Sequence, residues 1–168
     1  MPTVAPTPPA VVENPRTPHE LAATVRAFAA RRELWEPLVR FTRPERWYQR
    51  LAVGADHEVW LLTWLPGQGT EIHDHGGASG AFGVVRGELT ERTFALPAVD
   101  APRPPRLRSL TPPAVRAFGP RHVHQVTNPG PEPAVSIHAY APALATMSYY
   151  TETDEGALQL ERTDGVDD

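Results

Sequence analysis

Histidines carry the clearest chemistry in this sequence. His73 and His75 stand two residues apart around Asp74, and His122 and His124 repeat the spacing. On a β-strand, side chains at i and i+2 point to the same side, so each pair could offer two imidazole nitrogens to one metal ion. A third nitrogen from a distant strand would complete a set of three ligands and leave positions open for substrate. The spacing alone fits surface or hydrogen-bonded histidine pairs equally well.

Composition narrows the remaining chemistry. The 168 residues include no cysteine, which excludes disulfides, zinc–thiolate sites, iron–sulfur clusters and a cysteine nucleophile within this chain. All sixteen basic residues are arginines, so a lysine Schiff base is excluded as well. Twenty acidic residues give a formal net charge of −4, and nucleic acid is therefore not an expected partner.

The chain shows no feature that would direct it to a membrane. Residues 1–15 carry no positive charge ahead of an apolar run, so no signal peptide is expected. No apolar stretch approaches the roughly 18–20 residues that a membrane span requires. The expectation is one cytoplasmic domain acting as a monomer.

The domain that must position the histidines is expected over residues 17–150. A proline-rich arm, residues 1–16, precedes it, and residues 151–168 form an acidic tail that is expected to be solvated and frayed. The sequence from Thr17 to Glu20 has the form of a capping box, which predicts a helix over 18–31. A second short helix is predicted over 34–41, with Pro37 in its first turn.

From residue 46 to residue 150 the sequence changes to short β-type runs separated by glycine and proline. Such runs, with no helical stretch between them, predict a mainly β fold: an antiparallel, jelly-roll-like β-barrel with a short helical segment at its N-terminal end. The clearest runs are Val59–Leu65, Ala81–Glu88, Val115–Phe118, Val123–Thr127 and Val135–Tyr140.

The first histidine pair lies in a pattern that resembles the first motif of the cupin superfamily. Gly67, His73, His75 and Gly87 stand in the relation G-x5-H-x-H…G. Most metal-binding cupins place a glutamate ligand where this chain has Gly80. Among the cupins, the chain resembles in this respect the thiol dioxygenases, which lack the glutamate and hold iron with three neutral histidines.

The third ligand follows from the same resemblance. His124 and Asn128, in the form H-x3-N, resemble the end of the second cupin motif, whose usual proline–glycine lead-in is absent here. This spacing favours His124 over His122 as the third ligand, beside His73 and His75. His122 is then expected at the edge of the pocket or on the surface.

Two further segments narrow the match to one family. Ser136, His138 and Tyr140 alternate along a strand-like run and resemble the Ser-His-Tyr relay of the cysteine dioxygenases. Tyr48 and Arg50 resemble that family's Tyr-x-Arg element, in which the arginine binds the substrate carboxylate. The chain is therefore identified as a member of the cysteine dioxygenase family, with the resemblance spanning about residues 47–150.

The resemblance implies an iron(II)-dependent enzyme that adds both atoms of dioxygen to the sulfur of L-cysteine, giving cysteine sulfinic acid. The small thiol and dioxygen are its implied partners. Gln49 keeps another substrate open, because a related group that acts on 3-mercaptopropionate carries glutamine in place of the arginine. A one-residue change of register would exchange Arg50 for Gln49 in the pocket.

Other interpretations of the same residues also remain. The alternatives are oxidation of cysteamine or another small thiol, a cupin isomerase using a metal without redox chemistry, or a metal-free binding protein. Many animal members of the family join a pocket cysteine to the catalytic tyrosine, and the matching pair here is Gly80 and Tyr140. Without a cysteine, this chain is expected to be of the bacterial type that lacks the crosslink.

Overall fold

Helix α1 (Pro18–Ala30) begins as the capping box predicts. The Thr17 hydroxyl accepts a hydrogen bond from the Glu20 backbone N–H at 3.2 Å, and the Glu20 carboxylate accepts one from the Thr17 N–H at 2.7 Å. Leu21 and Val25 on one face of the helix are fully buried. The computed structural model describes residues 15–95 and 103–166, so nearly all of the expected arm (1–16) lies outside the described residues.

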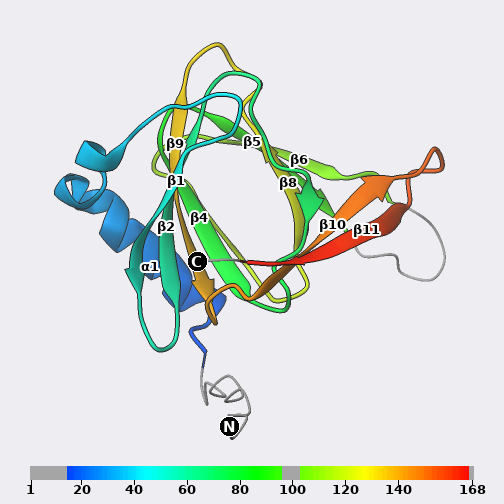
Figure 1. Ribbon diagram of the computed structural model, residues 1–168, viewed down its shortest axis with the longest axis horizontal. Helices are drawn as coiled ribbons and strands as arrows, with labels where there is room; N and C mark the ends of the chain where they lie inside the picture. The colour runs from blue at the N-terminus through cyan, green and yellow to red at the C-terminus, as the bar shows by residue number, and fades with distance from the viewer. Residues whose placement is uncertain (1–14, 96–102, 167–168) are drawn as a thin grey trace, which may run out of the picture.

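Two antiparallel sheets follow the helix and face each other (Figure 1). One has the order β1 (Tyr48–Val53), β2 (Glu58–Trp64), β9 (Ala134–Ala141), β4 (Ser79–Arg86) and β7 (Val115–Phe118). The other has the order β11 (Leu158–Gly165), β10 (Thr146–Glu152), β3 (Ile72–His73), β8 (Val123–Thr127), β5 (Leu89–Phe94) and β6 (Arg106–Leu110). The mainly β, jelly-roll-like class is thus confirmed, although within the described residues the sheets do not join into one closed barrel.

Strand β9 shows how the alternation of side chains divides the interior. All of its residues are buried. Val135, Ile137 and Ala139 belong to an apolar core that packs against α1 on the outer face of the five-stranded sheet. The alternate residues, such as Ser136 and His138, face the space between the sheets. The fold therefore places a polar row of β9 inside the protein, where it must find hydrogen-bond partners.

The region predicted as a second helix differs from the expectation. It forms two short 3-10 turns, η1 (Arg32–Leu34) and η2 (Glu36–Leu38), joined at the buried Trp35. Pro37 has no N–H to donate into an α-helical hydrogen bond, and the backbone N–H groups here bond to carbonyls three residues back.

The acidic tail also differs from the expectation of a frayed end. Strand β11 pairs with β10 over most of its length, from Thr146 opposite Gly165 to Glu152 opposite Leu158. The pairing supplies backbone hydrogen bonds that a polar sequence does not reveal by itself. In Figure 1 the two strands form a long ribbon that carries the C-terminal end back towards the centre of the molecule.

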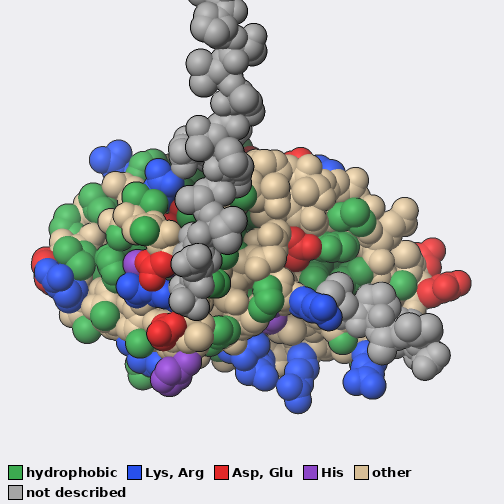
Figure 2. Space-filling view, turned by 90° about the horizontal axis from the view of Figure 1, so that it is seen from below, with side chains coloured by type: hydrophobic (Ala, Val, Ile, Leu, Met, Phe, Trp, Pro, Cys, Tyr) green, Lys and Arg blue, Asp and Glu red, His purple; other side chains and the backbone are tan. Residues whose placement is uncertain are grey.

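The surface gives no sign of one dominant charge on the face that Figure 2 shows. Acidic and basic side chains are interspersed there among apolar ones, with several arginines along one edge. Within the described part of the chain, none of the helices has the length and apolar character needed to cross a bilayer.

Candidate functional site

Strand pairing brings together the three histidines expected to bind a metal. His73 ends β3 and lies directly opposite His124 of β8, and His75 follows just beyond the strand. The nitrogen atoms that they could offer all lie within 4.8 Å of one another, and all three side chains are buried. His75 thus joins the group from a turn rather than from the strand expected for it.

The turn after β3 is held in place by Asp74. Its Oδ1 accepts hydrogen bonds from the backbone N–H of Gly76 at 3.0 Å and of Ser148 in β10 at 3.2 Å. Gly76 and the following Gly77 have φ angles of 59° and 88°, a region that favours glycine. Asp74 is therefore turned away from the histidines and anchors the segment that carries His75.

Hydrogen bonds leave each histidine with a nitrogen available for a metal. His73 Nδ1 donates to the Glu71 carbonyl at 2.8 Å, and His124 Nδ1 donates to Glu91 Oε1 at 2.9 Å, so Nε2 is the unprotonated nitrogen of both rings. Both nitrogens of His75 are buried and have no hydrogen-bond partner among the described residues. A buried imidazole without a partner is costly, and a metal ion in the triad would satisfy it. The residues present therefore fit a metal.

Burial keeps these imidazoles neutral. It lowers the pKa of His73 to about 3, with the neighbouring His124 adding to the effect, and it lowers the pKa of His75 well below 6.5. For His124, burial lowers the pKa while the hydrogen bond to Glu91 acts in the opposite direction. The neutral form is the one that binds metals, so the triad is ready for an ion without losing protons.

A buried carboxylate orients His124. Glu91 lies on β5, where it pairs with Val126 and stands diagonally across from His124 on the same face of the sheet. Burial alone would raise the pKa of Glu91, but hydrogen bonds from His122, His124 and Arg116 outweigh it and lower that pKa below 4.5. Glu91 belongs to none of the sequence motifs that predict the site, and the available signal is its strand parity with the core residue Leu89.

His122 and His124 play different structural parts. His122 Nε2 lies 3.0 Å from Glu91 Oε1, and the ring stacks on Phe118 at 4.3 Å between centroids. Glu91, His122 and His124 also form a group whose possible ligand atoms lie within 4.8 Å. Glu91 already accepts hydrogen bonds from three donors. The triad of His73, His75 and His124 is therefore the group whose nitrogens are available to bind a metal.

The Ser-His-Tyr row of β9 forms a continuous chain of hydrogen bonds. Trp64 Nε1 donates to Ser136 Oγ at 2.8 Å, Ser136 Oγ lies 2.8 Å from His138 Nε2, and His138 Nδ1 lies 3.2 Å from the Tyr140 hydroxyl. Within the described residues, the Ser136 hydroxyl has only His138 Nε2 to donate to, so the proton of the neutral imidazole is on Nδ1. His138 then donates to Tyr140, which leaves the Tyr140 hydroxyl hydrogen free for a ligand.

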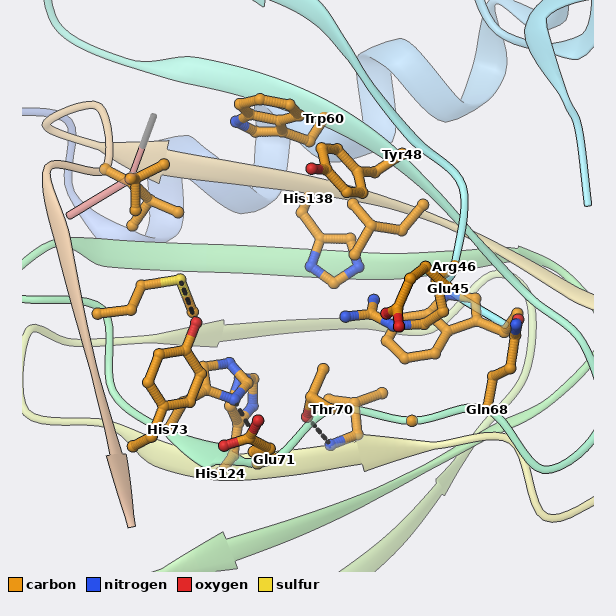
Figure 3. Close-up of a pocket in the computed structure, with 18 of the residues that line it drawn as sticks. Glu45, Arg46, Tyr48, Trp60, Gln68, Thr70, Glu71, His73, His124 and His138 are labelled. Carbon is orange, nitrogen blue, oxygen red and sulfur yellow. Dashed lines mark hydrogen bonds between the residues drawn. The ribbon is translucent and has the colours of Figure 1, made fainter. Parts of the chain in front are cut away.

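A cavity of about 1190 Å³ opens beside the triad. His73, His124 and His138 border it (Figure 3). Tyr140 of the relay also lines the cavity. Tyr48, which is 61% exposed, stands at its mouth. The end of β11 also lines the cavity, so the segment predicted to be a frayed tail forms part of the pocket wall.

Two arginines lie near the start of β1, the segment predicted to bind the substrate carboxylate. The described residues lining the cavity include Arg46 but not Arg50. The Arg50 guanidinium lies over the Trp60 ring at 5.5 Å, and its Nη1 is 3.7 Å from the buried Glu58 carboxylate. Arg46, Tyr48 and Arg50 stand at every second position, so strand alternation alone does not distinguish the two arginines.

Gly80 and Tyr140, the two positions that match the crosslinked pair of the animal enzymes, are direct neighbours. They are paired residues of β4 and β9. A Cβ at Gly80 would lie 2.4 Å from Cζ of Phe118 and 3.1 Å from Cδ1 of Tyr140. The Phe118 ring thus fills the space that a side chain at position 80 would occupy, and it stacks on His75 at 4.8 Å between centroids.

Comparison with known proteins gives one family and one fold. A family model described as cysteine dioxygenase type I matches residues 11–153. A Klebsiella pneumoniae protein with a double-stranded β-helix domain has a TM-score of 0.57 at 22% identity, covering 68% of this chain and 86% of its own. A Thermus thermophilus protein reaches 0.55 at 20%, covering 64% and 93%. A cupin superfamily protein from Desulfitobacterium hafniense reaches 0.52 at 14%, covering 64% and 87%.

Proposed function

Because the chain belongs to the cysteine dioxygenase type I family, we propose that it is an iron(II)-dependent thiol dioxygenase acting on L-cysteine. The reaction would add both atoms of dioxygen to the thiol sulfur and give cysteine sulfinic acid. The observation that carries the proposal is the buried triad, whose three neutral imidazoles include one with two nitrogens that have no hydrogen-bond partner among the described residues. The proposal takes a small thiol and dioxygen as the partners and a cytoplasmic monomer as the working form.

The donor set is suited to iron and to a thiol. His73, His75 and His124 would hold iron(II), which supplies the redox chemistry for dioxygen and, with neutral ligands only, a full +2 charge that favours an anionic thiolate. A carboxylate among the ligands would lower that charge by one. The oxygen-rich sites typical of magnesium or calcium have a different chemistry.

The relay would provide a hydrogen-bond donor at a fixed position. Ser136 and His138 hold the Tyr140 oxygen as an acceptor, so its O–H is directed elsewhere. Burial raises the pKa of Tyr140 above 10, which keeps the hydroxyl protonated. The ring stacks beside His75 at 5.3 Å, so the hydroxyl is near the triad. Tyr140 would donate to the substrate or to a developing negative charge on oxygen.

We propose that Tyr140 remains unmodified. The chain contains no cysteine to form a thioether, and Phe118 fills the space beside Gly80. The intact purified chain should have the mass calculated from its sequence, with no deficit of two hydrogens. A two-hydrogen deficit assigned to a peptide containing Tyr140 would contradict this part of the proposal.

The function is tested by oxygen uptake with added iron(II) and three thiols: L-cysteine, 3-mercaptopropionate and cysteamine. We expect L-cysteine to support the highest kcat/KM and to consume one dioxygen for each sulfinate formed. Replacing iron(II) with zinc(II) should abolish uptake. Activity that survives under anaerobic conditions, or that zinc supports, would favour a non-redox cupin enzyme instead.

A further inference from the structure

A row of paired side chains crosses the six-stranded sheet from the C-terminal strand to the histidine triad. Arg162 of β11 stands opposite Tyr149 of β10. Tyr149 in turn stands opposite His73 of β3, and His73 stands opposite His124 of β8. Residues paired directly across neighbouring antiparallel strands point to the same face of a sheet, and all four of these line the cavity. One side chain therefore separates the C-terminal strand from a residue of the triad.

An irregularity in β11 determines which of its residues joins this row. Tyr149 pairs with Arg162. The next residue, Tyr150, pairs with Leu160, so the pairing skips Glu161. A β-bulge of this kind changes which side chains of a strand face inwards. Regular pairing onward from Leu160 would place the negative charge of Glu161 at the cavity wall, and the bulge places an arginine there instead.

The Arg162 guanidinium connects two groups that adjoin His73. Its Nη1 and Nη2 donate to the two carboxylate oxygens of Glu71 at 2.8 and 3.0 Å, and its Nε donates to Asp164 at 3.0 Å. Its Cζ lies 4.1 Å from the centre of the Tyr149 ring, in a cation–π contact. A planar guanidinium bound to a carboxylate by two parallel hydrogen bonds has a defined orientation. Arg162 thus fixes Glu71 and Tyr149 relative to each other.

Glu71 and Tyr149 set the orientation of the His73 imidazole from two sides. The Glu71 backbone carbonyl accepts a hydrogen bond from His73 Nδ1 at 2.8 Å, the bond that leaves Nε2 for a metal. The Tyr149 ring lies 6.3 Å from the His73 ring, measured between centroids. Figure 3 shows Glu71 beside His73 at the cavity wall. Both neighbours of the imidazole are therefore held by the same arginine.

The exposure of the ion pair indicates that its contribution is to orientation more than to stability. The side chains of Arg162 and Glu71 are 41% and 55% exposed, and an ion pair at such a position adds little to the stability of a fold. Metal sites respond to orientation, because substituting the groups that orient the ligands typically costs about 10- to 100-fold in metal affinity.

We infer that Arg162 is a positioning residue for the metal site. Acting through Glu71 and Tyr149, it holds the His73 imidazole so that Nε2 faces the other residues of the triad. The inference rests on the proposed function only in taking the triad to bind iron(II), and the identity of the thiol does not enter it. The C-terminal strand is then part of the support of the metal site as well as the edge of a sheet.

The test is the iron(II) affinity of the full-length protein, measured anaerobically by competition with a chelator of known affinity. Arg162→Gln should weaken iron(II) binding by about 3- to 10-fold, less than the loss for a group bonded directly to a ligand. The absorption spectrum of the cobalt(II)-loaded protein, which reports the geometry of the ligands, should change as well. Urea unfolding of the metal-free protein should be almost unchanged. A merely structural role would lower that stability and leave the cobalt(II) spectrum unchanged.

Arg92→Gln is the matched control. Arg92 also makes an ion pair, with Glu152, and a cation–π contact, with Phe94 at 5.0 Å, but it lies on the opposite face of the same sheet. This variant should keep the iron(II) affinity of the wild type. Combining Arg162→Gln with Glu71→Gln tests the connection. Because both substitutions break the same contact, the double variant should bind iron(II) about as weakly as the weaker single variant, and not with the product of the two losses.

The outcomes separate the positioning role from the proposed function. Arg162→Lys keeps the charge without the planar fork, should also bind iron(II) more weakly than the wild type, and serves if the glutamine variant does not fold. Wild-type affinity in the Arg162 variants, or an equal loss in Arg92→Gln, would overturn the positioning role and leave the proposed function intact. If Arg162→Gln weakens iron(II) binding as expected but the wild type oxidises none of the three thiols, the positioning role stands and the proposed oxidation is wrong. A wild type that binds no iron(II) would overturn both.

Discussion

Glu91 Oε1 lies 2.9 Å from His124 Nδ1, so a buried carboxylate on β5 fixes the ring that β8 presents to the triad. Most metal-binding cupins have a glutamate among their metal ligands, and this chain has Gly80 at the position of that glutamate. A carboxylate is nevertheless present one hydrogen bond behind a ligand. It would set the tautomer and the basicity of His124 while a metal bound by the triad kept three neutral ligands.

Glu91→Gln should weaken iron(II) binding by about 10- to 100-fold. Loss of the carboxylate charge makes the His124 imidazole less basic, so it binds the metal more weakly, and it loosens the orientation of the ring. Affinity is measured by competition with a chelator of known iron(II) affinity. Glu88→Gln removes an exposed carboxylate just before the same strand and serves as the matched control. If both variants bind iron(II) as tightly as the wild type, Glu91 does not act through the metal ligand.

His122 and His124 can be told apart by metal content. His124→Ala should remove a ligand and leave less than about one tenth of the iron(II) of the wild type after gel filtration, by the rough cost of losing one of three ligands. His122→Ala removes a donor to Glu91 and a ring stacked on Phe118 but no nitrogen of the triad, so the variant should keep most of its iron.

The same measurement on His73→Ala and His75→Ala tests the other two ligands. Both should lose iron as His124→Ala does, since all three nitrogens lie within one 4.8 Å group. Iron retained in His124→Ala but lost in His122→Ala would exchange the roles of the two histidines. Circular dichroism of each variant shows whether the fold survives the substitution.

Gly80 tests how tightly the wall behind the triad is packed. Gly80→Ala places a methyl group 2.4 Å from the Phe118 ring and should lower the free energy of unfolding by about 1–3 kcal/mol. Gly119→Ala is the matched control, since its Cβ would meet no atom within 4 Å. Denaturant unfolding gives the comparison.

A second substitution shows whether Phe118 is the cause. Gly80→Ala combined with Phe118→Leu replaces a flat ring by a shorter side chain and should recover part of the lost stability beyond the sum of the single effects. Strict additivity of the two substitutions would mean that position 80 clashes with something other than Phe118.

The sequence predicts those parts of the site that local contacts determine. It does not predict the parts that depend on contacts between residues far apart in the chain. The alternation of Ser136, His138 and Tyr140 follows from the strand period, and the structure places all three in one hydrogen-bonded row. Glu91 reaches His124 only because β5 pairs with β8 across 33 residues of sequence. No local pattern contains that pairing.

The same distinction explains why one element of the fold was predicted from the sequence and another was not. Helix α1 was predictable because its capping box and apolar face are local features. The strand β11 was not, since its sequence is polar and acidic and only the partner β10 makes it a strand. Its end also completes the cavity wall, so part of the pocket could not have been found before the sheet order was known.

Asp56 links the segment before α1 to the turn between β1 and β2. Its carboxylate lies 2.7 Å from His57 Nδ1 and accepts a hydrogen bond from Arg16 Nε at 2.9 Å. These two contacts lower the pKa of Asp56 to about 2, from an ordinary value of 3.8. A carboxyl group whose pKa is lower in the folded state stabilises the fold above pH 3.8, and that contribution is lost as the pH falls through about 2.

Asp56→Asn should therefore remove part of the acid sensitivity of the fold. The wild type should be more stable than the variant at pH 6. The difference should shrink steadily as the pH is lowered from 4 to 2, because the wild-type carboxyl becomes protonated first in the unfolded state and then in the folded state. Urea unfolding at several pH values measures it. Asp154→Asn, an exposed change of the same charge in the β10–β11 turn, controls for net charge. A stability difference that stays constant from pH 6 to pH 2 would show that Asp56 acts through its shape and not through its charge.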